Sequence, residues 1–326
     1  MGFAEIFGQD HIVKNLRTAI QQDRVAHAYI FDGAEGLGKG MTAVAFAQAI
    51  VCKAFQQEPC NTCSACIKFH HNNHPDIMMI EPEGTSIKNK QIEAFQQDLQ
   101  RKPYESSKKV YIIKQGDQMT ESAQNRLLKT LEEPPEYGVI ILISENANRF
   151  LPTIRSRCQM MKFHRLGEQQ ILLFLREKYG MGPEESRVYA AFSDGIPGKA
   201  VQLKESPAFL EKREAAIGVI EKVLEGDPLS VFSLTDFFES NKDNIQELLD
   251  FMLTWFRDIL ILKETSSEDY LINLDKKKAL SSYALRIGYQ QINHIIKIIE
   301  RTKGDLKANI NFQLAIENML LSMQEV

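Results

Sequence analysis

Residues 28–40 read AYIFDGAEGLGKG, and this stretch identifies the class of fold. Residues 28–31 are apolar and suit one short buried strand, and an apolar helical pattern follows the last glycine through about residue 51. Between them, residues 33–40 begin with the form G-x-x-x-x-G-K. A glycine-rich turn from a strand into a helix is the setting of a phosphate-binding loop, because its backbone N–H groups and the helix N-terminus face the phosphates. We therefore predict a phosphate-loop fold in which Lys39 would reach the β and γ phosphates.

The residues around this loop predict how the fold continues. Further strands are expected at residues 77–80, 110–113 and 139–144, and helices at 10–22, 87–100 and 120–131. Strands that alternate with helices in this way form a parallel sheet with helical crossovers. From about residue 165 the alternation stops, and apolar residues recur every three to four positions. We therefore predict an α/β domain followed by an all-helical second half.

The loop lacks a residue that ATP hydrolysis requires. Its candidate nucleotide-binding residues are Gly33, Gly36, Gly38, Lys39 and Gly40. The last of these stands where a phosphate loop normally has the Ser or Thr whose hydroxyl ligates Mg²⁺. The next hydroxyl, on Thr42, lies two positions further on and about 200° around the helix, so it cannot replace the missing ligand.

The end of the third predicted strand lacks the other magnesium-binding group. An ATPase of this type has an acidic pair there, with an Asp for Mg²⁺ and a Glu to orient water. This chain has Lys114 and Gln115 instead, and neither an ammonium nor an amide can take over these tasks. We predict that the chain does not hydrolyse ATP. The loop is expected to be an inherited connection with weak or absent ATP binding, although Lys39 and the glycines alone could still hold an anion.

Four of the five cysteines lie close together in the sequence, at Cys52, Cys60, Cys63 and Cys66. Two overlapping C-x2-C pairs and one further thiolate provide the tetrahedral sulfur set that structural Zn²⁺ prefers, with no open position for water. In a reducing cytosol this clustering favours a metal site over disulfides. Free buried thiols do not suit so polar a stretch, and a redox pair would not need four cysteines. We predict a structural zinc site. The nearby histidines are expected to be solvated rather than ligands: His70, His71 and His74.

The bulk composition is that of an ordinary globular protein. The chain has 326 residues, of which 44% are hydrophobic and 25% charged, which suits two or three domains with substantial cores. The net charge of −4 does not by itself indicate nucleic-acid binding. No apolar run approaches the roughly 20 residues of a membrane-spanning helix, and residues 1–6 show no secretory signal. We therefore expect a cytoplasmic protein without membrane association.

Further motifs resemble those of a known family. They are Gly8-Gln9, His27-Ala28-Tyr29, the run NRLLKTLEEPP at residues 125–135, and Ser156-Arg157-Cys158. Together with the loop, they resemble the bacterial clamp-loader subunits of the DNA polymerase III holoenzyme, which belong to the AAA+ class. The missing magnesium ligands make the chain similar to the delta-prime branch of this family rather than to its gamma/tau motors. The resemblance covers most of roughly the first 200 residues, and the last third matches mainly as a helical pattern.

The resemblance implies a domain plan and a set of partners. Residues 1–165 would form the AAA+ domain, with a zinc module inserted at 52–66; residues 166–205 would form a helical lid, and 206–326 an all-helical collar domain for oligomerisation. The chain would be a non-hydrolysing stator in a ring that opens the sliding clamp and places it on primed DNA. Its expected partners are the gamma/tau and delta subunits, with primer-template DNA inside the complex and the beta clamp contacted only indirectly or weakly.

The resemblance also implies a role for Arg157. In this family the arginine of the Ser-Arg-Cys motif points into the ATP site of the adjacent gamma/tau subunit. Arginine suits such a role because it is always charged and its planar fork matches phosphate oxygens, and a guanidinium supplied in trans stabilises the charge on a transferring phosphoryl group. The simpler alternative is that Arg157 forms an ordinary salt bridge. Arg155, two positions earlier, could also be mistaken for the functional arginine.

Two other functions compete with this one. An active gamma/tau-type ATPase of the same ring is disfavoured by Gly40, Lys114 and Gln115. A zinc-module protein that binds nucleic acid on its own is disfavoured by the near-neutral charge and the disabled loop. We therefore predict that the chain is not an enzyme by itself but a non-catalytic subunit of a nucleotidyltransferase complex, the DNA-directed DNA polymerase III holoenzyme.

Overall fold

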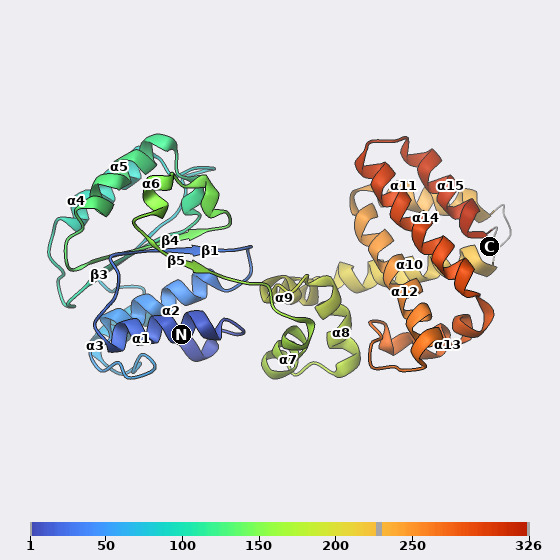
Figure 1. Ribbon diagram of the computed structural model, residues 1–326, viewed down its shortest axis with the longest axis horizontal. Coiled ribbons are helices and arrows are strands. Elements are labelled where there is room, and N and C mark those ends of the chain that lie inside the picture. Colours follow the sequence, from blue (N-terminus) through green and yellow to red (C-terminus); the bar gives the residue numbers. More distant parts are fainter. Residues whose placement is uncertain (1, 226–229, 325–326) are drawn as a thin grey trace. The chain divides into compact units, whose positions relative to one another are not determined.

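The computed structural model describes residues 2–225 and 230–324, and the chain divides into two compact units. The first unit comprises Met1–Ile171 together with Gly195–Lys199, and the second comprises Leu172–Asp194 together with Ala200–Val326. The first is an α/β unit and the second is helical (Figure 1). The predicted fold class is therefore confirmed.

Within the described residues, five strands form one parallel sheet in the order β2-β3-β4-β1-β5. They are β1 (Ala28–Asp32), β2 (Ile77–Ile80), β3 (Lys109–Ile113), β4 (Gly138–Ser144) and β5 (Gln159–Lys162). Strands β3 and β4 are buried along their whole length, as expected of central strands in a parallel sheet covered on both faces. Asp32 is in register with Ser144, so the loop after β1 lies at the same edge of the sheet as the end of β4.

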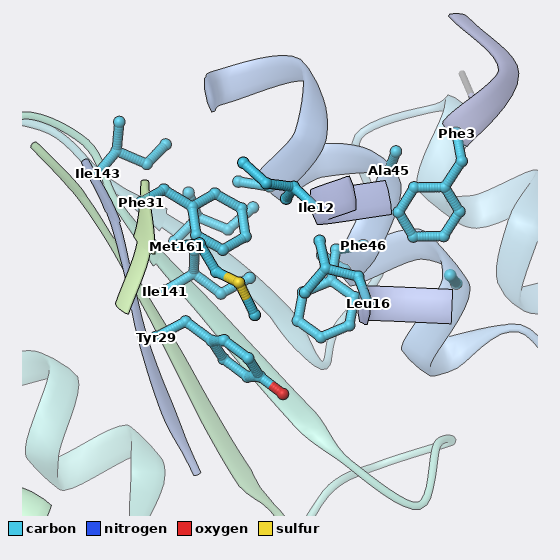
Figure 2. Packing of buried hydrophobic residues seen from close by; sticks show 14 of the residues in the cluster. Phe3, Ile12, Leu16, Tyr29, Phe31, Ala45, Phe46, Ile141, Ile143 and Met161 are labelled. Carbon is cyan, nitrogen blue, oxygen red and sulfur yellow. The ribbon is translucent and has the colours of Figure 1, made fainter. Parts of the chain in front are cut away.

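Helices cover both faces of this sheet (Figure 1). One face carries α1 (Asp10–Gln21), α2 (Lys39–Val51) and α3 (Ser64–His70), and the other carries α4 (Asn89–Leu99), α5 (Glu121–Glu132) and α6 (Pro152–Arg155). On the first face, Phe46 of α2 contacts Tyr29 of β1 with ring centroids 5.1 Å apart, and Leu16 of α1 belongs to the same cluster (Figure 2). This core fixes the direction in which α2 leaves the phosphate loop.

Several short elements of the first unit were not predicted, among them α3, β5 and α6. Strand β5 has exposed polar residues at both ends, Gln159 and Lys162, and its strand character comes from pairing with β1. The short helix α6 begins with Pro152. Proline is tolerated at its first position because the N–H group there would have no partner within the helix.

The second half of the chain is helical, as predicted. Its helices are α7 (Glu168–Tyr179), α8 (Pro183–Phe192), α9 (Pro197–Glu205), α10 (Pro207–Glu225), α11 (Ser230–Ser240), α12 (Ile245–Thr265), α13 (Lys277–Arg286), α14 (Tyr289–Lys307) and α15 (Phe312–Gln324). Trp255 and Phe256 of α12 are fully buried in the core of the second unit. Across residues 2–225 and 230–324, no helix is both long enough and apolar enough to cross a bilayer.

A buried polar network fixes the segment between α12 and α13. The carboxylate of Asp258, fully buried on α12, accepts hydrogen bonds from the backbone N–H groups of Ile272 (3.1 Å) and Asn273 (2.7 Å). Arg213 of α10 donates from Nε to Oδ1 of Asn273 (3.0 Å) and bonds both carboxylate oxygens of Asp275 (2.9 and 2.6 Å). Burial raises the pKa of Asp258, while the two backbone hydrogen bonds act in the opposite direction. Side chains of α10 and α12 therefore hold this segment in place.

Candidate functional site

The phosphate loop follows β1 and leads into α2, as predicted. Gly36 and Gly38 have φ angles of +81° and +88°, in a region that residues with a side chain rarely adopt. Gly38 is the N-cap of α2, and the N–H groups of the first helical turn have no partner within a helix. At Gly33, a Cβ atom would lie 2.7 Å from the carbonyl oxygen of Phe163. The glycines therefore allow a loop whose N–H groups can approach an anion closely.

Lys39 is directed into its own loop. Its ammonium donates to the carbonyl oxygens of Gly33 (2.5 Å) and Ala34 (2.7 Å), and the residue is 6% exposed. Burial lowers the pKa of Lys39, and the carboxylates of Glu145 and Asp32 act in the opposite direction. The lysine thus bonds loop carbonyls, and a phosphate group would have to replace these two hydrogen bonds.

Position 40 offers space but no metal ligand. A Cβ atom at Gly40 would meet no atom within 4 Å, so packing does not prevent a residue with a hydroxyl group there. Thr42 is fully buried, and its hydroxyl donates to the carbonyl oxygen of Gly38 at 2.9 Å. The hydroxyl of Thr42 is therefore engaged within the helix.

A cation lies directly after β3, where an ATPase of this type has its magnesium-binding acid. The ammonium of Lys114 is 2.6 Å from a carboxylate oxygen of Glu81, which directly follows β2. The next residue, Gln115, has a φ angle of +47° and begins a sharp turn. The positive charge of Lys114 is the opposite of the negative charge that the carboxylate ligands of Mg²⁺ carry.

A cavity of about 520 Å³ opens at this edge of the sheet. Its lining combines the loop with residues at the ends of β2, β3 and β4, among them Glu35, Lys39, Lys114, Ser144 and Glu145. Ser144 is 1% exposed, and its hydroxyl has no hydrogen-bond partner in the part of the chain that the structure describes. The volume is that of a small-ligand pocket. Its lining contains carboxylates as well as the two lysines, and these carboxylates would repel the phosphates of a nucleotide.

Sequence reasoning missed three polar residues of this cavity. They are Glu81, Ser144 and Glu145, each at or directly after the end of a strand. In an open α/β sheet, ligands bind beyond the carboxyl ends of the strands, so these positions were the available signal. The segment Gly195–Lys199 also contributes, since Gly198 lines the cavity.

Arg157 lies at a different place in the first unit, between α6 and β5. Its guanidinium donates to the carbonyl oxygen of Thr153 (3.0 Å) and to a carboxylate oxygen of Glu132 (2.9 Å), the last residue of α5. The side chain of Arg157 is 35% exposed. Arg155 donates instead to Oδ1 of Asn148 at 2.9 Å. Among the described residues, those that line the loop's cavity include neither arginine.

The four clustered cysteines come together in space. Their Sγ atoms all lie within 4.8 Å of one another, and those of Cys60 and Cys66 are 4.0 Å apart. A tetrahedral zinc site with Zn–S bonds of about 2.3 Å has sulfur atoms about 3.8 Å apart. Cys52 follows α2 and Cys66 lies on α3, so a metal ion would join two helices. The donor set therefore fits a structural zinc ion.

Two of these thiols have opposite pKa shifts. Hydrogen bonds from the backbone N–H groups of Thr62 and Cys63 lower the pKa of Cys60 to about 6. Burial raises the pKa of Cys66 to about 12. The protein alone therefore favours the thiolate at Cys60 but not at Cys66, and a divalent ion would supply the charge that stabilises the thiolate form of the buried Cys66.

The neighbouring histidines differ from one another. His70 and His71 are exposed, as expected. The expectation for His74 is wrong, because this residue is 6% exposed and its Nδ1 accepts a hydrogen bond from the backbone N–H of Asp76 at 3.2 Å. Burial lowers the pKa of His74. His74 is therefore a buried structural residue that bonds the backbone of Asp76.

Two protein-family models match the chain. The model described as "DNA polymerase III, delta subunit" matches residues 8–167, and the model described as "DNA polymerase III, delta subunit, C terminal" matches residues 207–325. The two matches lie on either side of residue 200 and together include both the loop and the helical region after α9.

Individual proteins give similar results. The chain is 35% identical to DNA polymerase III subunit delta' of Bacillus subtilis (strain 168), over 97% of this chain and 96% of that protein. It is 28% identical to DNA polymerase III subunit tau of the same organism, over 96% of this chain but 60% of the tau protein. Among solved structures, a gamma subunit-related protein of Thermotoga maritima is similar with a TM-score of 0.41 and 20% identity, over 96% of this chain and 98% of that chain.

Proposed function

The chain belongs to the DNA polymerase III delta-prime family, and on this basis we propose that it is a clamp-loader subunit that does not hydrolyse ATP itself. In this role it helps to load the sliding clamp onto primed DNA during replication. It supplies Arg157 in trans to the ATP site of a neighbouring gamma/tau subunit, where the guanidinium stabilises the charge that develops on the transferring phosphoryl group.

The observation that carries the proposal is the ion pair between Lys114 and Glu81 at the end of β3. Hydrolysis by a phosphate-loop ATPase requires Mg²⁺ bridging the β and γ phosphates and a residue that orients water. Here the ammonium of Lys114 stands in the place of the magnesium-binding acid, and Gly40 provides no hydroxyl. Each change removes a different magnesium ligand, so their effects combine.

The position of Arg157 supports a role in trans. Its guanidinium is partly exposed, and it does not contribute to the lining of its own loop's cavity in the described part of the chain. A side chain that cannot serve the local nucleotide site is available to an adjacent one. Its fork of N–H groups suits phosphate oxygens.

An active gamma/tau-type ATPase is the second candidate, because the tau protein of Bacillus subtilis is also a relative. The ion pair of Lys114 argues against it. The chain also aligns with nearly the whole of the delta' relative but with 60% of the tau relative. We therefore rank the motor function below the non-hydrolysing one.

The proposal extends to partners and domains. The gamma/tau and delta subunits would assemble with this chain in the cytoplasm, and primer-template DNA would enter the assembled complex. Residues 1–165, 166–205 and 206–326 would serve as AAA+ domain, lid and collar. The cysteine cluster would hold structural zinc, and the loop would bind ATP weakly or not at all.

Two experiments test the proposal. The purified chain, incubated with ATP and Mg²⁺, is expected to release no phosphate above a protein-free control, and turnover at the rate of a gamma/tau motor would refute the non-hydrolysing assignment. Mixed with purified gamma/tau and delta subunits, the chain is expected to elute with them from a size-exclusion column as one complex. Its failure to do so would refute the assignment to the clamp loader.

A further inference from the structure

The guanidinium of Arg157 is held by a carboxylate at the surface of the first unit. Glu132, the last residue of α5, accepts a hydrogen bond from Nη2 of Arg157 at 2.9 Å. The other terminal nitrogen, Nη1, donates to the carbonyl oxygen of Thr153 at 3.0 Å. Each terminal nitrogen of the fork thus has one of its two N–H groups bonded to an oxygen atom of the same chain.

These oxygen atoms occupy the positions that a phosphate would take. An arginine recognises a carboxylate and a phosphate with the same planar fork of donors. A phosphoryl oxygen must therefore compete with the carboxylate of Glu132 for the N–H of Nη2 that this carboxylate accepts, although each terminal nitrogen carries a second N–H group. Since Glu132 is itself negatively charged, it would also repel a phosphate brought to the same guanidinium.

We infer that Glu132 is a positioning residue that restrains Arg157 until a neighbouring nucleotide replaces it. The inference rests on the proposed function, in which Arg157 acts on a neighbour's ATP. While the neighbour's site is incomplete, Glu132 keeps the guanidinium against α5 and α6. When the ring closes around the clamp and DNA, phosphate oxygens take over Nη2 and Glu132 returns to solvent.

The exposure of both side chains makes such an exchange possible. The side chain of Arg157 is 35% exposed and that of Glu132 is 49% exposed. Ion pairs at this degree of exposure are weak and are exchanged readily, unlike buried pairs, whose separation leaves a charge without a partner. An ion pair of this kind can slow the binding of Arg157 to a phosphate without preventing it.

The test uses the reconstituted loader with the substitution Glu132→Gln. Without clamp and DNA, we expect ATP turnover to rise about two- to five-fold, the range that an exposed ion pair can account for. The rise should occur in kcat, with KM for ATP unchanged, because Glu132 contacts Arg157 and not the nucleotide-binding loop. The matched control is Glu133→Gln, since Glu133 is the exposed neighbour and has no ion pair in the described stretches of the chain.

The double variant Glu132→Gln, Arg157→Ala shows whether the effect passes through Arg157. We expect it to turn over ATP at the rate of Arg157→Ala alone. Retention of the increase in the double variant would overturn the inference, and so would wild-type turnover in Glu132→Gln when Arg157→Ala lowers the rate. If Arg157→Ala itself left turnover unchanged in an intact complex, the proposed role in trans would fail, and the inference with it.

Discussion

The backbone N–H of Gly198 donates to the carbonyl oxygen of Gly36 at 3.0 Å, so the start of α9 lies directly against the phosphate loop. A Cβ atom at Gly198 would lie 2.7 Å from Cα of Gly36, and one at Gly36 would lie 2.7 Å from Cγ2 of Ile196. Two backbones approach this closely only where neither residue has a side chain. The loop is thus supported by the chain's own Gly195–Lys199 segment.

Replacing Gly198 with alanine should therefore destabilise the first unit. The added Cβ atom meets backbone that cannot move without disturbing the loop, so we expect the free energy of unfolding to fall by about 1–3 kcal/mol. Urea unfolding followed by circular dichroism measures this change. The control is Gly40→Ala, whose Cβ atom would meet nothing within 4 Å and which should not lower stability, since alanine is favoured over glycine in a helix. Equal stability of the two variants would contradict the prediction.

Replacing Arg157 with alanine should lower the clamp-dependent ATPase of the reconstituted loader without affecting its assembly. An arginine supplied in trans contributes about 10³-fold or more to phosphoryl transfer in well-studied GTPases, so the neighbouring site it serves should become nearly inactive. The steady-state rate of ADP release by the whole loader would then fall by at least the fraction that this site contributes. Arg155→Ala is the control, because Arg155 lies outside the Ser-Arg-Cys motif and bonds Asn148 rather than Glu132. An unchanged rate with an intact complex would exclude the role.

Replacing Cys60 or Cys63 with serine should release the metal. The wild-type chain is expected to contain about one zinc ion, since four thiolates complete one tetrahedral site. Inductively coupled plasma mass spectrometry of the purified variants should show zinc far below that ratio, together with a lower melting temperature. Cys158→Ser serves as the control, because Cys158 lies outside the four-cysteine cluster. Full zinc occupancy in the Cys60 and Cys63 variants would refute the assigned ligands.

Replacing Asp98 with asparagine should reduce stability in a way that depends on pH. Oδ2 of Asp98 lies 2.8 Å from the ammonium of Lys109, which is 1% exposed, and accepts a hydrogen bond from the Tyr111 hydroxyl at 2.7 Å. Burial acts to raise the pKa of Asp98, but the bonds from Lys109 and Tyr111 prevail and bring it below its usual 3.8. The variant should lose about 2 kcal/mol or more at neutral pH, because a buried ammonium is left without its partner.

The sign of the pH dependence follows from that lowered pKa. A carboxyl group with a lower pKa in the folded state contributes its full stability above 3.8, and this contribution is lost as the pH falls through the folded-state value. The difference in unfolding free energy between wild type and Asp98→Asn should therefore be constant near neutral pH and shrink below 3.8. Glu93→Gln, which removes an exposed partner of Arg126, should show little difference throughout. A difference for Asp98→Asn that grew towards low pH would contradict the assignment.

Local sequence patterns were sufficient to predict the phosphate loop and most of the sheet. Strand β4 is a continuous apolar run because it is buried on both faces, and the glycines at positions 36 and 38 have the positive φ angles that a phosphate loop needs. The approach of three of the four Sγ atoms also follows from spacing, since Cys60, Cys63 and Cys66 form two overlapping C-x2-C pairs.

Features that depend on distant partners could not be predicted. Strand β5 exists because Gln159 pairs with Tyr29 of β1, and nothing in the local pattern of its residues requires a strand. Likewise, the partner of Lys114 could not be known from the sequence, since Glu81 precedes it by 33 positions.

The buried carboxylate of Asp258 also indicates the order in which the helical unit assembles. Ile272 and Asn273 find their partners on α12, and the side chain of Asn273 finds another on α10, in Arg213. The hydrogen bonds that hold this segment therefore require both helices to be in place. Its two amide hydrogens should exchange with solvent faster than those in the middle of α12, since they are released by a local opening that leaves the helices intact. The segment would be the last part of this region to form and the first to open.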